Sequence, residues 1–390
     1  MIRIYYAERD TTLYEKHTER NTGIDTVLEL TKIASGSRAF ENGISLGIQD
    51  KTYNSRILID FGSEITSLAD SISNGEIPSL TNQNPTSASA FLNLRATSAA
   101  DLLHSYTIEA YPISESWDNG NGTFGDEPEA RIGSSWLYRS GDAKAETGVP
   151  WTTGSAASQG TSAGTSETDG GGAWITGSGF EASQSFQNES PDLRIDVTDI
   201  IKKWTAGGIT NNGFIIKRPY TDEISGEVLG SLKFFGRESH TIFVPRLEIC
   251  WDDSLVTDTD NVITSNTYVP YFKNIKAEYR TSEIARFFVG VRPEFPTKSY
   301  ATSSFYITKD QLPISSSYEI LDSVTDDVII KDEKIFGNSK TKISTNLTDG
   351  SFFDLRMDSF MPERYYKIKL TCRRTYDTQT FDDFYFKVVK

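Results

Sequence analysis

Hydrophobic and polar residues alternate with a period of two along most of the chain. Clear examples are residues 55–61, 106–111 and 213–217, which are rich in β-branched and aromatic side chains and are separated by Gly, Asn, Asp and Pro. This alternation places successive side chains on opposite faces of a strand. The pattern therefore predicts an all-β protein built from short antiparallel strands in a sandwich or a barrel.

Helical patterns are few. Residues 197–204 predict one short helix with Ile200, Ile201 and Trp204 on one face, which Thr198 can cap and Gly207-Gly208 would end. A second short helix is predicted over residues 65–72, because Asn74-Gly75 follows it.

Breaks in composition divide the chain into segments. A run of almost only Gly, Ser, Thr and Ala at 152–172 predicts a long surface loop, and the polar stretch 253–266 predicts a linker. With 390 residues, the chain is long enough for two or three domains. We therefore predict a β-domain over 1–252, a linker over 253–266 and a smaller β-domain over 267–390.

The C-terminal segment has the length and strand spacing of an immunoglobulin-sized sandwich. Residues 360–366 resemble the sequence that leads into a fibronectin type III strand, in which a tyrosine hydroxyl ties the strand to the preceding loop. Tyr366 is the candidate for this tyrosine corner. The alternative is an ordinary core tyrosine.

Charge and hydropathy exclude several partners. The chain has 54 Asp and Glu against 39 Lys and Arg, which gives a formal net charge of −15 and disfavours general nucleic-acid binding. No window approaches the roughly 18 consecutive apolar residues of a membrane helix. The first residues lack the features of a signal peptide. We therefore expect neither a nucleic-acid nor a membrane partner.

Cysteine and histidine usage predicts no metal centre. Cys250 and Cys372 stand in strand-like runs, which favours buried, reduced thiols over a disulfide between them. No G-x-S-x-G sequence is present, and the histidines lack metal-ligand spacing. The three histidines are His17, His104 and His240. No catalytic, cofactor-binding or metal-binding residue is predicted, and we expect no enzyme activity and no cofactor.

A segment with several tryptophans precedes the low-complexity run. Residues 118–122, Asp-Asn-Gly-Asn-Gly, predict a turn-rich loop, with a calcium loop as the alternative, although the spacing departs from the EF-hand pattern. Trp117 and Trp204 are predicted to anchor a core or a loop rather than to stack on a sugar. Three further tryptophans are predicted to be exposed near loops: Trp136, Trp151 and Trp174.

Six segments, in order, resemble the DNRLRE family, which is also classed near carbohydrate-binding module family 96. They lie at residues 10–30, 55–61, 114–117, 196–214, 235–239 and 245–249. The resemblance implies a jelly-roll-like β-sandwich for the N-terminal domain. Arg237 and Glu238 belong to the closing signature. As neighbours on one strand, they would face opposite sides and pair with other groups.

The whole layout resembles virion structural proteins of T4-like tailed phages, including residues 296–304 and 386–389. The resemblance implies a non-enzymatic structural protein of the neck, tail, baseplate or head decoration, made in the host cytoplasm. Its expected partners are other virion proteins and further copies of itself in a symmetric assembly. The alternative is a carbohydrate-binding module for a surface polysaccharide, and a depolymerase is less supported because no acid pair is visible.

The C-terminal domain is rich in residue types that are common at interface hot spots. We predict that it docks onto another protein, the alternative being that these residues belong to its core. The candidates are Tyr271, Phe272, Arg286, Arg292, Tyr300 and Arg364.

Overall fold

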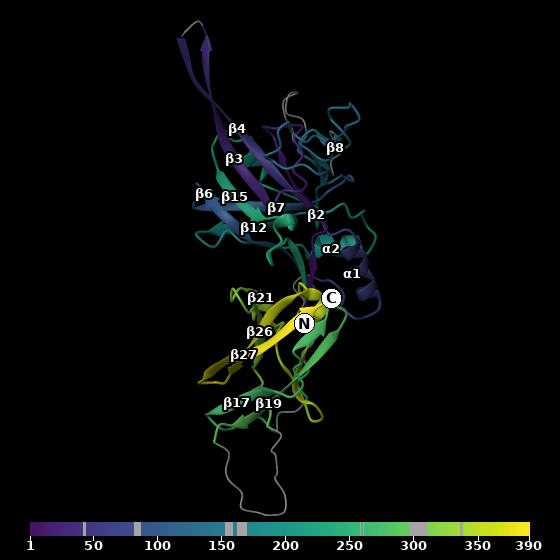
Figure 1. Cartoon of the computed structure of the whole chain (residues 1–390), viewed down its shortest axis with the longest axis vertical. Helices are drawn as coiled ribbons and strands as arrows, with labels where there is room; N and C mark the ends of the chain where they lie inside the picture. Colours follow the sequence, from purple (N-terminus) through teal and green to yellow (C-terminus); the bar gives the residue numbers. More distant parts are fainter. Residues whose placement is uncertain are drawn as a thin grey trace, which may run out of the picture. The chain divides into compact units, whose positions relative to one another are not determined.

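The computed structural model describes residues 1–41, 44–81, 87–152, 159–161, 170–257, 259, 261–295, 310–335 and 338–390. Strands dominate these residues, which confirms the predicted all-β sandwich fold. The chain forms two compact units (Figure 1). The N-terminal unit comprises Tyr5–Asn82 and Ser89–Glu248, and the C-terminal unit comprises Met1–Ile4, Gln83–Ala88 and Ile249–Lys390. Independent domains divided at 253–266 stay a prediction.

An eight-stranded sheet forms most of the N-terminal unit. In order, its strands are β12 (Ala182–Gln187), β7 (Ser105–Pro112), β14 (Phe214–Lys217), β4 (Ile44–Asp60), β3 (Val27–Glu41), β15 (Gly230–Phe235) and β6 (Ala96–Ala100), with β2 (Arg9–Tyr14) also paired to β4. A four-stranded sheet has the order β1 (Ile2–Tyr6), β16 (Arg246–Cys250), β5 (Ser89–Leu94) and β13 (Leu193–Asp196). Two short ribbons pair β8 (Tyr138–Ser140) with β9 (Val149–Pro150), and β10 (Gln159–Thr161) with β11 (Ala173–Ile175).

The centre of the large sheet is buried on both faces. Three consecutive residues of β4, Ile57, Leu58 and Ile59, are inaccessible to solvent, and so are three of β14, residues 214–216. A strand that is covered on both sides needs a continuous apolar run rather than strict alternation. Leu58 belongs to a cluster of tryptophans on one face of the sheet. Phe214 faces the other way and packs against Trp204, with 4.6 Å between their ring centroids.

Both predicted helices are present in the N-terminal unit. They are α1 (Ser63–Ser73) and α2 (Thr198–Thr205), and a short α3 (Tyr220–Ile224) and the 3₁₀ turn η1 (Arg237–Ser239) follow. Ile200, Ile201 and Trp204 of α2 are buried, as predicted. The cap is different, because Asp196 rather than Thr198 accepts the first amide, at 3.0 Å. The Thr198 hydroxyl instead accepts a hydrogen bond from the amide of Ala90.

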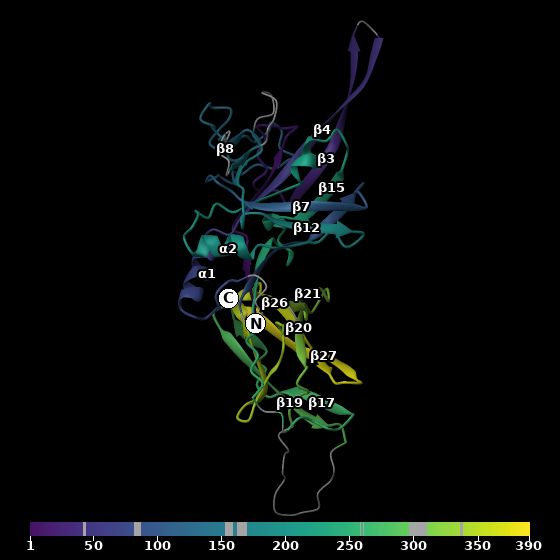
Figure 2. The same ribbon diagram turned by 180° about the vertical axis from the view of Figure 1, so that it is seen from behind.

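The C-terminal unit contains two sheets, whose strands can be followed from behind in Figure 2. One has the order β17 (Tyr268–Phe272), β19 (Ile284–Pro293), β25 (Gly350–Arg356) and β24 (Ser344–Asn346). The other has the order β18 (Glu278–Arg280), β27 (Thr378–Val389), β26 (Arg364–Arg373), β20 (Ser317–Asp322) and β21 (Val328–Ile330). The ribbon of β22 (Lys334–Ile335) and β23 (Asn338–Ser339) and the 3₁₀ turn η2 (Met357–Ser359) complete the unit.

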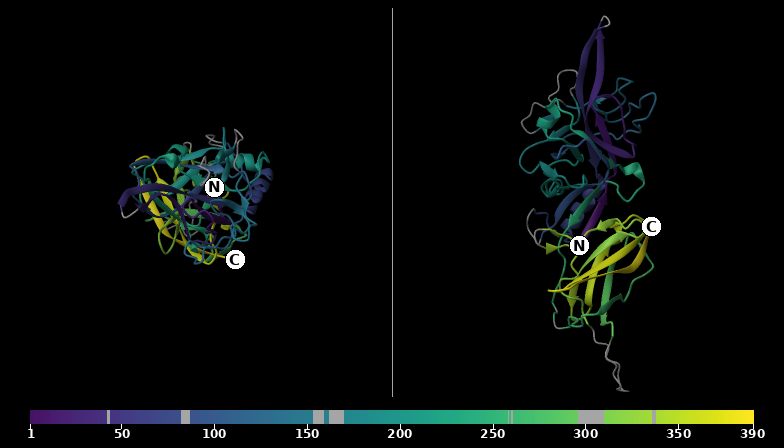
Figure 3. Two further views of the ribbon diagram at one scale, coloured as in Figure 1. Left: turned by 90° about the horizontal axis from the view of Figure 1, so that it is seen from above. Right: turned by 90° about the vertical axis from the view of Figure 1, so that its left-hand side faces the viewer.

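Aromatic rings join the two sheets of the C-terminal unit, whose strands are drawn in green and yellow in the right-hand view of Figure 3. Phe353 of β25 stacks on Tyr318 of β20, with 4.2 Å between centroids, and Phe287 of β19 lies 5.8 Å from Phe386 of β27. The Tyr366 hydroxyl donates to the carbonyl of Met361 at 2.9 Å. This bond from a strand back to the preceding loop confirms the predicted tyrosine corner.

The first residues of the chain belong to the C-terminal unit. The Met1 ammonium donates to the carbonyls of Trp251 and Lys340, and Arg3 pairs with Asp358 at 3.0 Å. Cys250 and Cys372 are both buried thiols in this unit, as predicted, and they form no disulfide. A truncation after residue 252 would therefore remove the Lys340 carbonyl that Met1 binds and the Asp358 carboxylate that pairs with Arg3.

Candidate functional site

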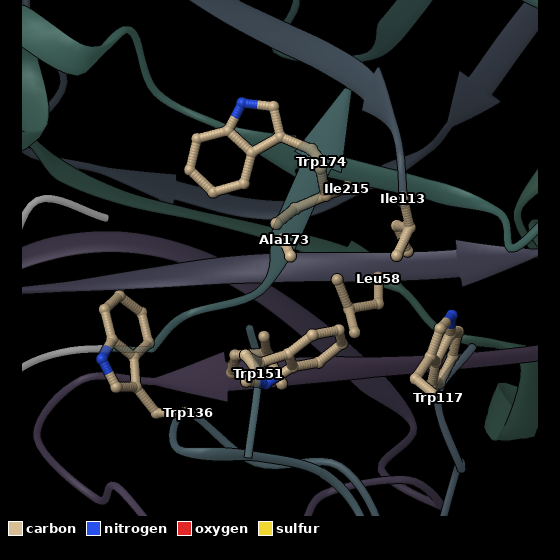
Figure 4. Packing of buried hydrophobic residues seen from close by; sticks show 9 residues of the cluster. Leu58, Ile113, Trp117, Trp136, Trp151, Ala173, Trp174 and Ile215 are labelled. Atoms are coloured by element: carbon tan, nitrogen blue, oxygen red, sulfur yellow. The ribbon is translucent and has the colours of Figure 1, made fainter. Parts of the chain in front are cut away.

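Four tryptophans cover one face of the large sheet (Figure 4). The loops that follow β7 carry three of them, and β11 carries the fourth. They pack on the aliphatic side chains of Leu13, Leu58 and Ile215. The tryptophans are Trp117, Trp136, Trp151 and Trp174. The loop segment between β7 and β11 is therefore attached to the sheet by buried aromatic rings.

The burial of Trp117 and Trp204 confirms the structural interpretation of these two residues. The predicted exposure of Trp136, Trp151 and Trp174 is wrong, because they are only 1%, 4% and 6% exposed. Loop composition alone could not show that these rings turn inward to cover a sheet that is apolar on both faces. They therefore offer no open platform for a sugar.

A buried ionic cluster lies beside the tryptophans. The guanidinium of Arg56 on β4 donates from Nε and Nη2 to the two carboxylate oxygens of Glu223 on α3, at 2.9 and 2.8 Å. The ammonium of Lys217 on β14 lies 3.0 Å from the same carboxylate. All three side chains are buried. Arg56 also stacks between Trp136 and Trp174, about 5 Å from each ring centroid.

The electrostatics of this cluster favour a fixed charge over proton transfer. Burial alone would raise the pKa of Glu223, but the Arg56 and Lys217 cations outweigh it and hold the pKa below its usual value. Burial lowers the pKa of Lys217, and Glu223 opposes that shift. A carboxylate held in this way stays ionised and fully paired near neutral pH. The cluster therefore fastens α3 and the tryptophan loops to the sheet.

Three glycines link this cluster to the tryptophans. Gly170, Gly171 and Gly172 all have positive φ angles, and the Gly171 carbonyl accepts from Arg56 at 2.7 Å. A Cβ atom at Gly171 would lie 2.5 Å from the Arg56 guanidinium. This end of the predicted surface loop 152–172 is therefore built into the fold, whereas residues 153–158 and 162–169 lie outside the described residues.

Residues 118–122 form a turn around a single amide side chain. The Asn21 amide group donates to the carbonyls of Asn119 and Ser134, and its oxygen accepts from the amide of Gly122. The described residues contain no group of three or more His, Cys, Asp or Glu side chains placed to hold a metal ion. The geometry supports the turn-rich loop as the interpretation of this segment.

The opening and closing segments of the family resemblance meet in the structure. The carboxylate of Asp10 on β2 accepts a 2.7 Å hydrogen bond from the amide of Arg237. The prediction for Arg237 and Glu238 is wrong, because they lie in the turn η1 rather than on a strand and form an ion pair with each other. A 3₁₀ turn brings adjacent side chains closer than a strand does.

Asp10 makes stability depend on pH. Burial raises the pKa of its carboxyl to about 7, although the Arg237 amide opposes the shift. The folded chain then holds a proton that the unfolded chain loses near pH 3.8, so this group's contribution to stability falls as the pH rises from about 4 to 7. The other charges near Asp10 are those of Arg237, Glu238 and Asp25.

We therefore expect Asp10→Asn to gain stability over the wild type as the pH rises through this window. The variant keeps an oxygen for the Arg237 amide and never carries a buried charge. Thermal unfolding at several pH values measures the difference in melting temperature. The control is Asp70→Asn, an exposed position on α1 that should give a flat difference. A flat or falling difference for Asp10→Asn would contradict this account.

The β3–β4 hairpin extends past every other strand of its sheet (Figure 1). Residues 27–32 of β3 pair with β15, and residues 55–60 of β4 pair with β2. From Ile33 paired with Tyr53 to Glu41 paired with Ile44, the two strands pair only with each other among the described residues. We call residues 33–53 the arm. At 3.4 Å per residue, its length is roughly 30 Å.

The predicted docking residues of the C-terminal domain separate into different environments. Phe272 packs in the core against Phe384, with 4.7 Å between centroids. Arg286 is exposed, but its guanidinium forms a bidentate pair with Asp354 at 2.8 and 2.9 Å. Tyr271, Arg292 and Arg364 are exposed or half-buried, and Tyr300 lies outside the described residues. Phe272 is therefore separated from the exposed candidates, whereas Tyr271, Arg286 and Arg292 share the outer face of the β17–β19 pair.

Comparison with known proteins shows no family for this chain. No protein family model and no curated protein matches the sequence. A solved structure, the β-glucuronidase of Parabacteroides merdae with glycerol in its active site, aligns with 97% of this chain and 35% of its own. The identity is 9% and the TM-score is 0.16. None of the helices in the described part of the chain is long and apolar enough to cross a membrane.

Proposed function

We propose that this chain is a non-enzymatic structural protein of a tailed-phage particle, working through protein–protein contacts. The proposal rests on the resemblance of its sequence layout to phage virion proteins and on its two β-sandwich units. The single observation that carries the contact role is the arm, a strand pair that leaves its own sheet.

The arm gains little stability from the rest of its own chain. A two-stranded hairpin is at best marginally stable in water without further strands or a packed face. Among the described residues, no third strand pairs with either outer edge of the arm, and an open strand edge readily pairs with another chain. In the sequence, Ile44, Leu46 and Ile48 alternate with polar or small residues, as in a strand with one apolar face. A strand of a neighbouring protein would pair with an open edge of the arm and cover its apolar face.

The carbohydrate-binding alternative receives less support. It drew on Trp136, Trp151 and Trp174 as exposed rings, and all three are buried in the cluster on the large sheet. An aromatic ring that binds a sugar by stacking must have an open face. The particle proposal therefore remains the better supported of the two.

Shortening the arm tests the contact role. Residues 35–51 are replaced by Asn-Gly, which closes the hairpin with a two-residue turn between Ala34 and Thr52, a directly opposed pair. We expect the variant to fold with a melting temperature close to that of the wild type but not to enter particles. Incorporation is measured by immunoblot of particles assembled in cells that supply only the variant.

A matched variant separates the arm from general damage. It replaces residues 375–377, which form the exposed turn between β26 and β27, with the same Asn-Gly pair. This variant should enter particles normally. Normal incorporation of the shortened-arm chain would move the contact role to another surface.

A further inference from the structure

A cavity of about 220 Å³ opens in the C-terminal unit. Its lining comes from the start of β20, the β22–β23 ribbon, the end of β26 and the segment after β16. We call it the serine cup. The lining residues are Asp252, Ser315, Ser316, Ser317, Lys334, Ser339, Lys342 and Arg373. The volume is below the 300–1,000 Å³ of pockets for drug-sized ligands, so it suits one small polar group.

The charge of the serine cup opposes that of the whole chain. Lys334, Lys342 and Arg373 face a single lining carboxylate, Asp252, in a chain whose formal net charge is −15. The ammonium groups of Lys334 and Lys342 form no ion pair or hydrogen bond with the described residues. Cations that converge on a concave surface without a protein partner favour an anionic ligand.

A buried carboxylate fixes the third cation. Asp332 accepts hydrogen bonds from the hydroxyls of Ser317, Ser339 and Thr341 at 2.7, 3.2 and 3.1 Å, and its side chain is 7% exposed. It also pairs with Nη2 of Arg373, whose Nη1 donates to Ser317 at 2.7 Å. These bonds hold the pKa of Asp332 below its usual value against the effect of burial.

The fixed guanidinium is ready to bind a ligand. Arginine has five N–H donors in a rigid plane. Asp332 and Ser317 take two of the donors of Arg373, and the others have no acceptor among the described residues. The exposed hydroxyl of Ser315 adds a neutral donor at the same cavity. Fixed Arg donors, mobile Lys ammoniums and hydroxyls together suit the several oxygens of a phosphate or sulfate.

We propose that the serine cup binds a tetrahedral oxyanion, either free phosphate or sulfate or the same group carried as an ester. A dianion would neutralise the two unpartnered lysines, and Arg373 would orient it. This inference is independent of the role in a phage particle, because its residues belong to the C-terminal unit and not to the arm.

Titration calorimetry of the full chain at constant ionic strength tests the proposal with sodium phosphate, sodium sulfate and glucose 6-phosphate. Saturable binding is expected. Lys342→Gln should weaken it about tenfold, the loss of one charge-assisted contact. Lys334→Gln, on β22, is the second variant in case the first does not fold. Equal affinity for phosphate and glucose 6-phosphate would show that the site recognises the free anion. Tighter binding of glucose 6-phosphate would show that the site recognises the anion as part of an ester.

The control removes the same charge elsewhere in the unit. Lys273 is exposed, and its ammonium has no ion pair or hydrogen bond among the described residues. Lys273→Gln should leave the affinity unchanged. The proposal is overturned if none of the three anions binds saturably. It is also overturned if Lys273→Gln and Lys342→Gln weaken binding equally, because that result means general attraction and not a site.

Discussion

Replacing Glu223 with alanine should destabilise the N-terminal unit by about 3–5 kcal/mol, the cost typical of breaking a buried ion pair. The substitution leaves the Arg56 guanidinium and the Lys217 ammonium buried without their shared carboxylate. It also removes the carboxylate that links α3 to β4 and β14. Glu223→Gln should cost less, because its amide oxygen can still accept one hydrogen bond from Arg56.

Urea denaturation followed by tryptophan fluorescence measures this loss, since Trp136 and Trp174 lie against Arg56. Glu227→Ala is the matched control, because Glu227 is exposed and close by in the sequence. It should change stability by less than about 0.5 kcal/mol. An equal, small effect of both substitutions would show that the cluster does not hold α3 in place.

The ion pairs of Glu223 with Arg56 and Lys217 also predict how stability depends on pH. The pKa of Glu223 is held below its ordinary value of 4.5 in the folded chain, so its contribution to stability is complete above pH 4.5 and is lost at lower pH. The advantage of the wild type over Glu223→Ala should therefore shrink as the solution is acidified below pH 4.5. An advantage that grows on acidification would contradict this assignment.

Truncating Trp117 to alanine should cost about 3–5 kcal/mol, as for other large aromatic side chains in a core. The indole is 3% exposed, its Nε1 donates to the carbonyl of Asn212 at 2.8 Å, and the Arg9 guanidinium lies 4.5 Å from its ring. The variant loses both the packing and the bond that fasten the loop after β7 to the sheet.

Trp117→Phe should recover part of the loss, because it restores the ring but not the Nε1 donor. Tyr376→Ala is the control, since Tyr376 is 99% exposed, and it should be close to neutral. Thermal unfolding compares the three variants. If Trp117→Ala keeps the wild-type melting temperature and instead abolishes binding to a glycan, the structural role is wrong.

Features that depend on a local pattern could be predicted from the sequence. Alternation predicted the strands, the spacing of Ile200, Ile201 and Trp204 predicted the buried face of α2, and the sequence before Tyr366 predicted its bond to the preceding loop. Each of these features depends on residues that lie within about one turn or one strand of each other. Short-range periodicity is therefore sufficient for them.

Features that depend on distant partners could not be predicted in this way. Glu223 is separated from Arg56 by 167 positions, and nothing near either residue shows that they pair. Arg237 and Glu238 looked like strand residues because a three-residue 3₁₀ turn has no periodicity to detect. The arm had a signal that can be used, since Asn42-Gly43 in the sequence is a typical hairpin dipeptide between alternating runs.

The most direct test of the proposed role in a tailed-phage particle is the protein composition of gradient-purified phage particles assembled in cells that produce this chain. Quantitative mass spectrometry after repeated gradients and a high-salt wash should find the chain at a constant ratio to the major particle proteins. Such a ratio is expected of a component with a fixed place in a symmetric assembly. Recovery of the chain only in the free-protein fraction, with none in the washed particles, would contradict a structural role in the virion.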